Sequence, residues 1–210
     1  MKAIYWNFLL VYTFCLFACN NNPKSPCPDD METGFVQNRP YNLTDHLAKK
    51  GIPILAENYD VPREFGYHMD TFFNRYLEME EALVKADTAK ANAAANVMLF
   101  LLSLVDKPMK EKVTAKAWET YSAGYEKNLR AFIGAKSLQE KRLYFSYISE
   151  YLYSTFKSFH MKKEDIHLVY CPMAFNEKGA YWLSANHKIR NPYFGDERLK
   201  CGQITEVLPE

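Results

Sequence analysis

Two sulfur donors lie two residues apart near the C-terminal end of the chain, in the segment Cys171-Pro172-Met173. On an extended backbone, residues at this spacing point to the same face, so the thiol and the thioether would converge. Thiolate and thioether ligands select soft ions such as Cu(I). Cys201 supplies a third sulfur that could close such a site if the C-terminal segment folds back on itself.

The first 18 residues have the features of a bacterial lipoprotein signal peptide. A positive Met1-Lys2 precedes the run Ile4–Ala18, which is almost wholly apolar and shorter than the roughly 20 residues that span a bilayer. The run ends in Leu16-Phe17-Ala18-Cys19, which resembles a lipobox. We therefore expect a signal peptide over residues 1–18 and lipid on Cys19; an uncleaved anchor is the alternative.

Export would place the remaining cysteines in an oxidising space, where thiols tend to pair or to bind metal. Removal of Cys15 and lipidation of Cys19 leave Cys27, Cys171 and Cys201, and we expect Cys27 to be the unpaired one. A Cys171–Cys201 disulfide would close a loop of about 30 residues and contribute about 3–4 kcal/mol. This disulfide, a metal site and free buried thiols all remain open.

Composition and motifs exclude several classes of function. The net charge is +1, so no strong basic field favours nucleic acid. The chain has no Gly-rich phosphate loop, nucleophile elbow or His-Glu-x-x-His motif, and we expect no enzymatic activity. Zinc is less expected than Cu(I), because the Cys-x-x-Cys and His pairs of zinc sites are missing. Glu78, Glu80 and Glu81 are expected on a hydrated helix face.

Apolar residues recur at three- and four-residue steps between residues 60 and 160, which predicts four amphipathic helices. Asp60 and Thr114 are the expected caps of the first and third helices, and the second is expected to start after Asp87. The fourth is expected to open with the capping box Ser137-Leu138-Gln139-Glu140. Similar helix lengths and short connections predict a mainly α fold, an up-and-down four-helix bundle.

The helical spacing of apolar residues ends near residue 160. Residues 166–171 and 180–184 are expected to be strands, residues 201–207 could form a third, and Asn191-Pro192 marks a turn. We therefore predict four parts in the chain. They are a signal peptide over 1–18, a lipidated Pro-rich tether over 19–59, the bundle over 60–160 and a β-like appendage over 161–210 packed on the bundle.

Two stretches resemble an uncharacterised bacterial family of exported helical domains. The first is Tyr76–Val84 with His68 before it; the second combines Tyr170-Cys171-Pro172-Met173-Ala174 with Asn176, Lys178–Ser184, Ile189–Gly195 and Cys201-Gly202. The resemblance covers roughly residues 62–207. Members of that family occur as lipoproteins or periplasmic proteins, and others are fused to periplasmic adaptor subunits of copper/silver-type heavy-metal efflux systems.

The resemblance implies a role in metal handling. It implies a ligand set of His68, Cys171, Met173 and Cys201, with Cu(I) or another soft ion bound, and an efflux adaptor as partner. One position departs from the family, because Arg198 stands where members often have methionine. We expect a lipid-anchored protein of the outer membrane, facing the periplasm. The alternative is a structural or protein-interaction domain with a Cys171–Cys201 disulfide, no metal and an aromatic docking surface (Tyr181, Trp182, Tyr193, Phe194).

Overall fold

The computed structural model describes residues 41–57, 59, 61–105, 109, 111–159, 161 and 165–208. The expected signal peptide, Cys19 and Cys27 lie outside these residues, as does the expected cap Asp60. Within the described residues, no helix combines the length and the apolar character needed to cross a membrane.

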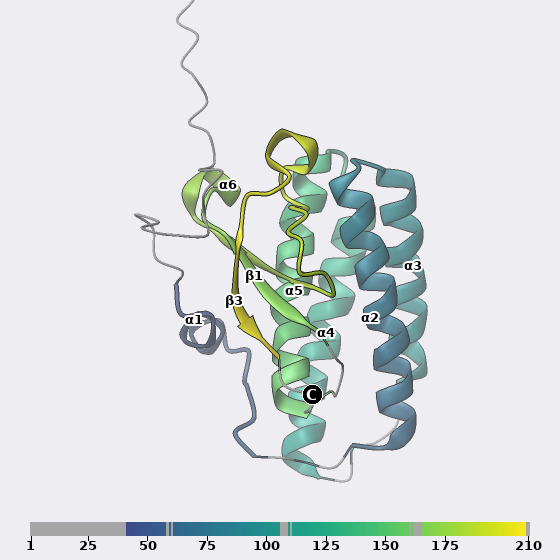
Figure 1. Ribbon diagram of the computed structural model, residues 1–210. Helices are drawn as coiled ribbons and strands as arrows, with labels where there is room; N and C mark the ends of the chain where they lie inside the picture. The colour runs from purple at the N-terminus through teal and green to yellow at the C-terminus, as the bar shows by residue number, and fades with distance from the viewer. Residues whose placement is uncertain are drawn as a thin grey trace, which may run out of the picture.

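Helices dominate the fold and a small antiparallel sheet follows them (Figure 1), which confirms the mainly α class and the C-terminal β element. The long helices are α2 (Arg63–Val84), α3 (Thr88–Leu104), α4 (Lys112–Gly134) and α5 (Leu138–Phe159), and the short α1 (Leu43–Lys49) precedes them. The C-terminal part contains β1 (His167–Cys171), α6 (Ala174–Glu177), β2 (Ala180–Ser184), the 3-10 helix η1 (Gly195–Arg198) and β3 (Gln203–Val207).

Local side-chain chemistry sets the starts of the long helices. Ser137 Oγ accepts from the Glu140 N–H at 3.1 Å, and Glu140 Oε2 accepts from the Ser137 N–H at 3.0 Å, so the predicted capping box is confirmed. Helix α3 begins directly after Asp87, as expected, and the Asp87 side chain caps it by accepting from the Lys90 N–H at 3.0 Å. Thr114 was expected to cap α4, but it lies inside the first turn and its hydroxyl donates to the Glu111 carbonyl at 2.8 Å.

The apolar stripes of the long helices form the core. The predicted inward residues of α2 are all buried: Phe65, Met69, Phe72, Tyr76, Met79 and Leu83. Consecutive long helices pack on one another, α2 on α3, α3 on α4 and α4 on α5, and they lie side by side along their length (Figure 1). Packing of this kind explains why helical spacing alone predicted the core.

The three-stranded sheet has the order β2-β1-β3 and is antiparallel throughout. Every residue of β1 and β2 is buried, and β2 packs against α5. Tyr170 of β1 pairs with Tyr181 of β2 and with Gln203 of β3. The predicted strands at 166–171, 180–184 and 201–207 are therefore confirmed to within two residues.

Tyrosine hydroxyls satisfy the open edge of strand β2. Tyr76 OH, from α2, accepts the Leu183 N–H at 3.0 Å and hydrogen-bonds to Ser149 Oγ of α5 at 2.7 Å. Tyr193 OH donates to the Tyr181 carbonyl on the same edge. An unpaired edge strand leaves orphan backbone groups, which are costly when buried. The Tyr76 hydroxyl thus joins α2, α5 and the sheet at one buried point.

The segment Tyr41–Leu55, predicted to belong to the tether, is part of the folded body. Leu43, Leu47 and Ile52 are buried, and the Leu55 N–H donates to Ser158 Oγ at 2.9 Å. Because Leu43 and Leu47 are four residues apart, they share one face of α1 and dock it. The tether predicted over residues 19–59 is therefore wrong over this segment.

A buried carboxylate holds α1 in place. Glu150 of α5 accepts from Lys50 Nζ at 2.6 Å and lies 3.2 Å from His46 Nε2. The flanking prolines Pro40 and Pro53 favoured an extended chain in the sequence, but these contacts depend on α5, which is distant in sequence.

We predict that Tyr76→Phe destabilises the protein by about 1–3 kcal/mol, because the buried Leu183 N–H loses its acceptor. Urea unfolding followed by far-UV circular dichroism measures this loss. Tyr67→Phe is the matched control on the same helix, since Tyr67 is 70% exposed, and it should leave the midpoint unchanged. Equal midpoints for Tyr76→Phe and Tyr67→Phe would contradict the role given to the Tyr76 hydroxyl.

Candidate thiol site at the end of strand β1

Two predicted ligands, Cys171 and Cys201, meet at one end of the sheet. Cys171 ends β1 and Cys201 lies two residues before β3, so the pairing of β1 with β3 brings the two together. Their sulfur atoms are 3.7 Å apart, and both residues are buried. Cys171 is a free thiol, whereas Cys201 is disulfide-bonded.

The expected Cys171–Cys201 disulfide is therefore not formed in the structure, because a disulfide bond requires sulfur atoms about 2.05 Å apart and Cys201 already has another partner. Cys27 was expected to be the unpaired cysteine. Among the described cysteines, the free thiol is Cys171.

Burial and local polar groups act in opposite directions on the Cys171 thiol. Burial is the largest effect and raises its pKa. The Asn191 side-chain amide, the N–H groups of Met173 and Ala174, and the charge of Arg198 each lower this pKa. The site therefore surrounds a buried sulfur with groups that stabilise its anionic form.

Asn191 organises the loop around both sulfurs, and sequence reasoning identified it only as a turn marker. Its side-chain amide donates to the Cys201 carbonyl, and its Oδ1 accepts from the Tyr193 N–H at 2.8 Å. Its backbone N–H donates to the Leu199 carbonyl at 2.8 Å. Asn191 is completely buried, so these bonds replace the water that its side chain loses.

The residues after Met173 form a left-handed turn. Phe175, Asn176 and Glu177 have φ values of 53°, 57° and 65°, which residues other than glycine rarely adopt. Gly179, with φ of 77°, ends the turn, and a Cβ there would lie 2.1 Å from Tyr170 OH. The turn reverses the direction of the chain between the antiparallel strands β1 and β2. Such strain concentrates at functional sites.

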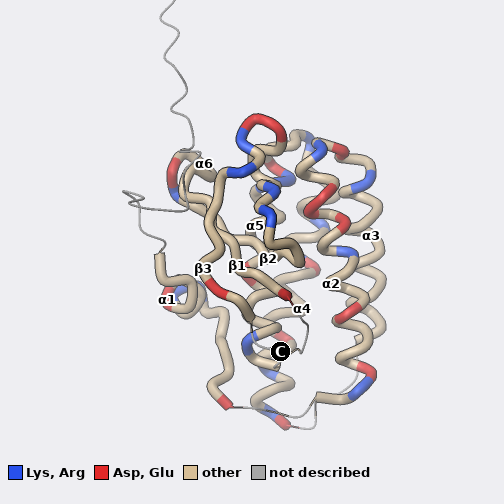
Figure 2. The backbone as a smooth tube through the Cα atoms, in the orientation of Figure 1, with Lys and Arg blue, Asp and Glu red and all other residues tan. Residues whose placement is uncertain are grey.

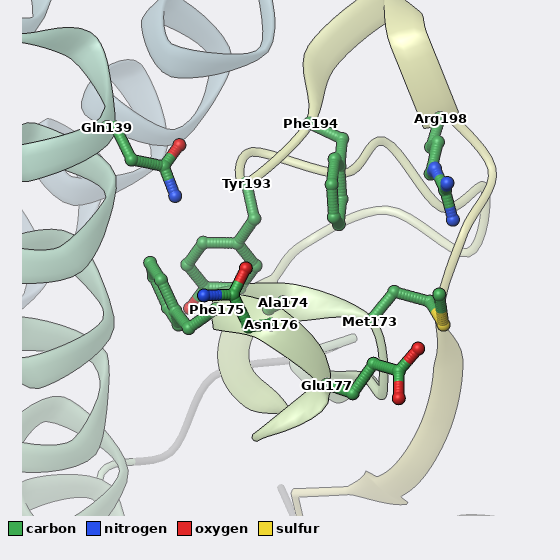
Figure 3. A pocket seen from close by; sticks show the side chains of 9 residues that line it. All are labelled: Gln139, Met173, Ala174, Phe175, Asn176, Glu177, Tyr193, Phe194 and Arg198. Carbon is green, nitrogen blue, oxygen red and sulfur yellow. The ribbon is translucent and has the colours of Figure 1, made fainter. Parts of the chain in front are cut away.

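A cavity of about 300 Å³ opens beside this turn (Figure 3). Met173, Glu177 and Arg198 lie on one side of it, and Gln139 of α5 enters from the other (Figure 3). The Arg198 guanidinium lies 5.3 Å from the Phe194 ring, and its buried Nη1 has no hydrogen-bond partner within the described part of the chain. The structure thus brings Met173 and Arg198 to one cavity.

The structure does not bring His68 to the thiols. His68 is half-buried near the start of α2, where its ring contacts Tyr67 at 5.7 Å. It precedes Glu80, which contacts the sheet, by twelve helical residues, a rise of about 18 Å. His167, at the opposite end of β1 from Cys171, contacts His187, with the ring centroids 4.5 Å apart.

Other described residue groups around the site add no further metal ligands or open aromatic face. In the part of the chain that the structure describes, no three His, Cys, Asp or Glu side chains are grouped to hold a metal ion. Of the four aromatic residues expected to form a docking surface, Tyr181, Trp182 and Tyr193 are buried in the core, and Phe194 is half-buried. Figure 2 shows basic and acidic residues interspersed along α2 and around η1, in line with the net charge of +1.

Glu80 is a second buried ionisable group, close to the sheet. It was expected on a hydrated helix face, but it follows Tyr76 by four residues and shares its buried face. Trp182 Nε1 donates to its Oε1 at 3.1 Å. Burial raises the Glu80 pKa to about 8, against the opposing effects of hydrogen bonds from Ser184 and Trp182.

The described structure defines a class, a mainly α domain whose small C-terminal sheet brings two buried cysteine sulfurs together. Residues 72–164 match a family model described as "Protein of unknown function (DUF3347)". This match fits the expected resemblance to an uncharacterised family. It begins within α2 and ends before β1, so Cys171 and Cys201 lie outside it. No curated protein and no solved structure matches the chain.

We predict that Glu80 makes stability fall as pH rises. Between the ordinary pKa of 4.5 and about 8, the folded protein keeps a proton that the unfolded chain loses, so unfolding becomes easier by up to about 1.4 kcal/mol per pH unit. Glu80→Gln should remove this slope and be the more stable form at pH 8. Urea unfolding at several pH values measures it.

Glu78→Gln is the matched control, because Glu78 lies on the same helix and its side chain is 55% exposed. It should keep the slope of the natural protein. A Glu80→Gln variant whose stability runs parallel to that of the natural protein from pH 5 to 8 would refute the assignment.

Proposed function

We propose that this chain is an exported, lipid-anchored protein that binds a soft metal ion of the copper type at Cys171, Cys201 and Met173. Its four long helices would act as an up-and-down bundle that holds the sheet. The proposal rests on one observation, the 3.7 Å separation of the two sulfur atoms. It does not include catalysis or nucleic-acid binding.

The sulfur separation suits two thiolates that share one ion. Metal–thiolate bonds are about 2.3 Å long, so two sulfurs on one ion lie about 3.8 Å apart at a tetrahedral angle and about 4.0 Å apart at a trigonal one. A linear arrangement would need about 4.6 Å. The sulfurs of Cys171 and Cys201, at 3.7 Å, thus need little movement to hold a three- or four-coordinate ion.

Met173 is the proposed third ligand, because it follows Cys171 by two residues, lines the cavity and carries a thioether, a group that favours Cu(I). His68 is left out of this site, since it lies near the far end of α2. Binding requires reduction of the Cys201 disulfide and loss of the thiol protons.

The cellular location and the partner protein are part of the same proposal. A signal peptide over residues 1–18 and a lipid on Cys19 would hold the protein at the outer membrane, facing the periplasm. There it would buffer a soft ion or pass it to a periplasmic adaptor of a heavy-metal efflux system. The lipobox-like Leu16–Cys19 segment and the resemblance to efflux-associated domains support this part.

We predict that the reduced full-length lipoprotein, in detergent, binds Cu(I) in competition with a chelator. Cys171→Ser and Cys201→Ser should each weaken binding by more than about a hundredfold, because loss of an outer hydrogen-bond partner alone costs about 10–100-fold. Met173→Leu should weaken it less, and Met98→Leu, a buried methionine of α3, is its control. Equal binding by the natural protein and the double serine variant would sink the proposal.

We also predict that Arg198→Met tightens Cu(I) binding by about tenfold. The substitution adds a thioether, a ligand that favours Cu(I), and this gain outweighs the loss of the Arg198 charge, which stabilises the Cys171 thiolate. Arg130→Met is the control, because Arg130 is exposed on α4 and pairs with Glu126. Unchanged or weaker binding by Arg198→Met would contradict the placement of residue 198 at the metal site.

A structural or interaction domain without metal is the second candidate, and the disulfide of Cys201 favours it. A disulfide there would tie the C-terminal sheet to another segment and leave no thiolate pair. The same Cu(I) titration separates the two candidates, because this one predicts no binding even after full reduction.

A further inference from the structure

Two histidines meet at the end of the sheet that is remote from the thiols. His167 opens β1, and its Cα partner in β2 is Ser184. The chain leaves β2 at Ser184 and returns His187 to the ring of His167, so that the two ring centroids lie 4.5 Å apart. Ser184 Oγ accepts from the Asn186 N–H at 3.3 Å and holds this bend. The register of the two strands thus brings together two imidazoles that are far apart in the sequence.

The His167 ring lacks a hydrogen-bond partner that its burial would lead us to expect. The residue is 2% exposed, and its buried Nδ1 makes no hydrogen bond within the described part of the chain. Buried polar atoms without a partner are rare in native proteins, and a bound ion is one of their recognised explanations. His187 is exposed, so solvent reaches the pair from its side. The pair therefore combines an unsatisfied buried nitrogen with a route for an ion to enter.

The separation of the two rings fits two imidazoles on one metal ion. A metal–nitrogen bond of about 2.0–2.1 Å places the ion about 3.2 Å from the centre of each ring. Two rings at a right angle on that ion have centres about 4.5 Å apart, and at the tetrahedral angle about 5.2 Å apart. The observed separation of 4.5 Å matches the right angle. A right angle between neighbouring ligands is typical of square-planar and tetragonal sites.

The ligand type and the angle together select the ion. Right-angled coordination by nitrogen favours Cu(II) or Ni(II) over zinc, which prefers tetrahedral sites. Of these two ions, Cu(II) binds the more tightly to a given set of nitrogen ligands. Among the described residues, the pair is not part of any group of three His, Cys, Asp or Glu side chains able to hold a metal. Water from the exposed side would therefore complete the coordination.

We propose that His167 and His187 form a second metal site, which binds Cu(II) through two imidazole nitrogens and water. It lies at the other end of β1 from Cys171, four residues or about 13 Å away at about 3.3 Å per residue. The two sites differ in ligand and in ion, because thiolates and thioethers select Cu(I) and imidazoles accept Cu(II). The histidine site does not rest on the proposed thiol site, and the proposal includes no transfer of electrons or ions between them.

Titration of the full-length lipoprotein with Cu(II), in detergent and without reductant, tests the site. Cys171→Ser is the parent for the titration, because it removes the free thiol of the described residues, which would otherwise compete for the ion. Glycine in the buffer competes with weak surface sites. We expect one Cu(II) to bind per chain, and we expect pulsed electron paramagnetic resonance to show two coordinated imidazoles.

Two variants of this parent each remove one ligand. His167→Gln and His187→Gln should each weaken Cu(II) binding by more than about tenfold, because even the loss of an outer hydrogen-bond partner of a ligand costs about 10–100-fold. His187→Gln is the decisive variant, since residue 187 is exposed and its replacement leaves the buried strand untouched. His68→Gln is the matched control, because His68 lies on α2 with its ring against Tyr67, and it should bind Cu(II) as the parent does.

The proposal is overturned if His187→Gln binds Cu(II) as tightly as the parent does, or if the spectrum of the parent shows fewer than two imidazoles. Equal weakening by His68→Gln and His187→Gln would mark an adventitious surface ion and overturn it as well. In the otherwise natural protein, His187→Gln should leave Cu(I) binding by the reduced thiols unchanged. Failure of the histidine site is therefore distinguishable from failure of the proposed function.

Discussion

A single buried hydroxyl, that of Tyr76, is the point on which the fold depends. It connects a helix, a neighbouring helix and the open edge of a strand through Ser149 Oγ and the Leu183 N–H. The strand it satisfies, β2, pairs with β1, and the last residue of β1 is Cys171. The position of Cys171 therefore depends in part on the hydrogen bond between the Leu183 N–H and Tyr76 OH at the open edge of β2.

Two other tyrosine hydroxyls also bond to serine or threonine hydroxyls of α5. Tyr125 hydrogen-bonds to Thr155 at 2.8 Å and Tyr121 to Ser158 at 2.8 Å, both in the core. The Thr155 hydroxyl already donates to the Tyr151 carbonyl of its own helix at 2.9 Å, so the Tyr125 hydroxyl satisfies its remaining acceptor capacity. At Tyr76, Tyr121 and Tyr125, tyrosine thus supplies both buried apolar area and a hydrogen-bond partner.

The elements that sequence reasoning predicted well were those decided by local chemistry. The capping box of Ser137 and Glu140 and the apolar stripe of α2 depend only on neighbours along the chain. The features that it missed depend on distant partners. Glu80 is buried because Trp182 covers it, and α1 docks because Glu150 of α5 receives its cations.

The features of the candidate site differ in the same way: some could be predicted from the sequence, and others depend on the folded structure. The meeting of Cys171 and Cys201 was anticipated, because the motif order and a returning strand imply it. The left-handed turn at Phe175–Glu177 was not, since neither Phe nor Glu favours that conformation. The role of Asn191 was also hidden, because its partners are backbone groups and a sulfur that only the folded loop assembles.

The Tyr76–Leu183 and Glu80–Trp182 hydrogen bonds carry a practical lesson for anyone who wishes to transplant this domain. The segment that matches the family model, residues 72–164, stops short of both strand partners and begins partway through α2. A fragment with those borders would lack β2 and expose the side of α5 that packs against it. The Tyr76 hydroxyl and the Glu80 carboxyl would each lose a hydrogen-bond donor. A portable piece therefore needs at least the residues from the docked Tyr41 to Leu208, and the borders of the family match are poor guides for cloning it.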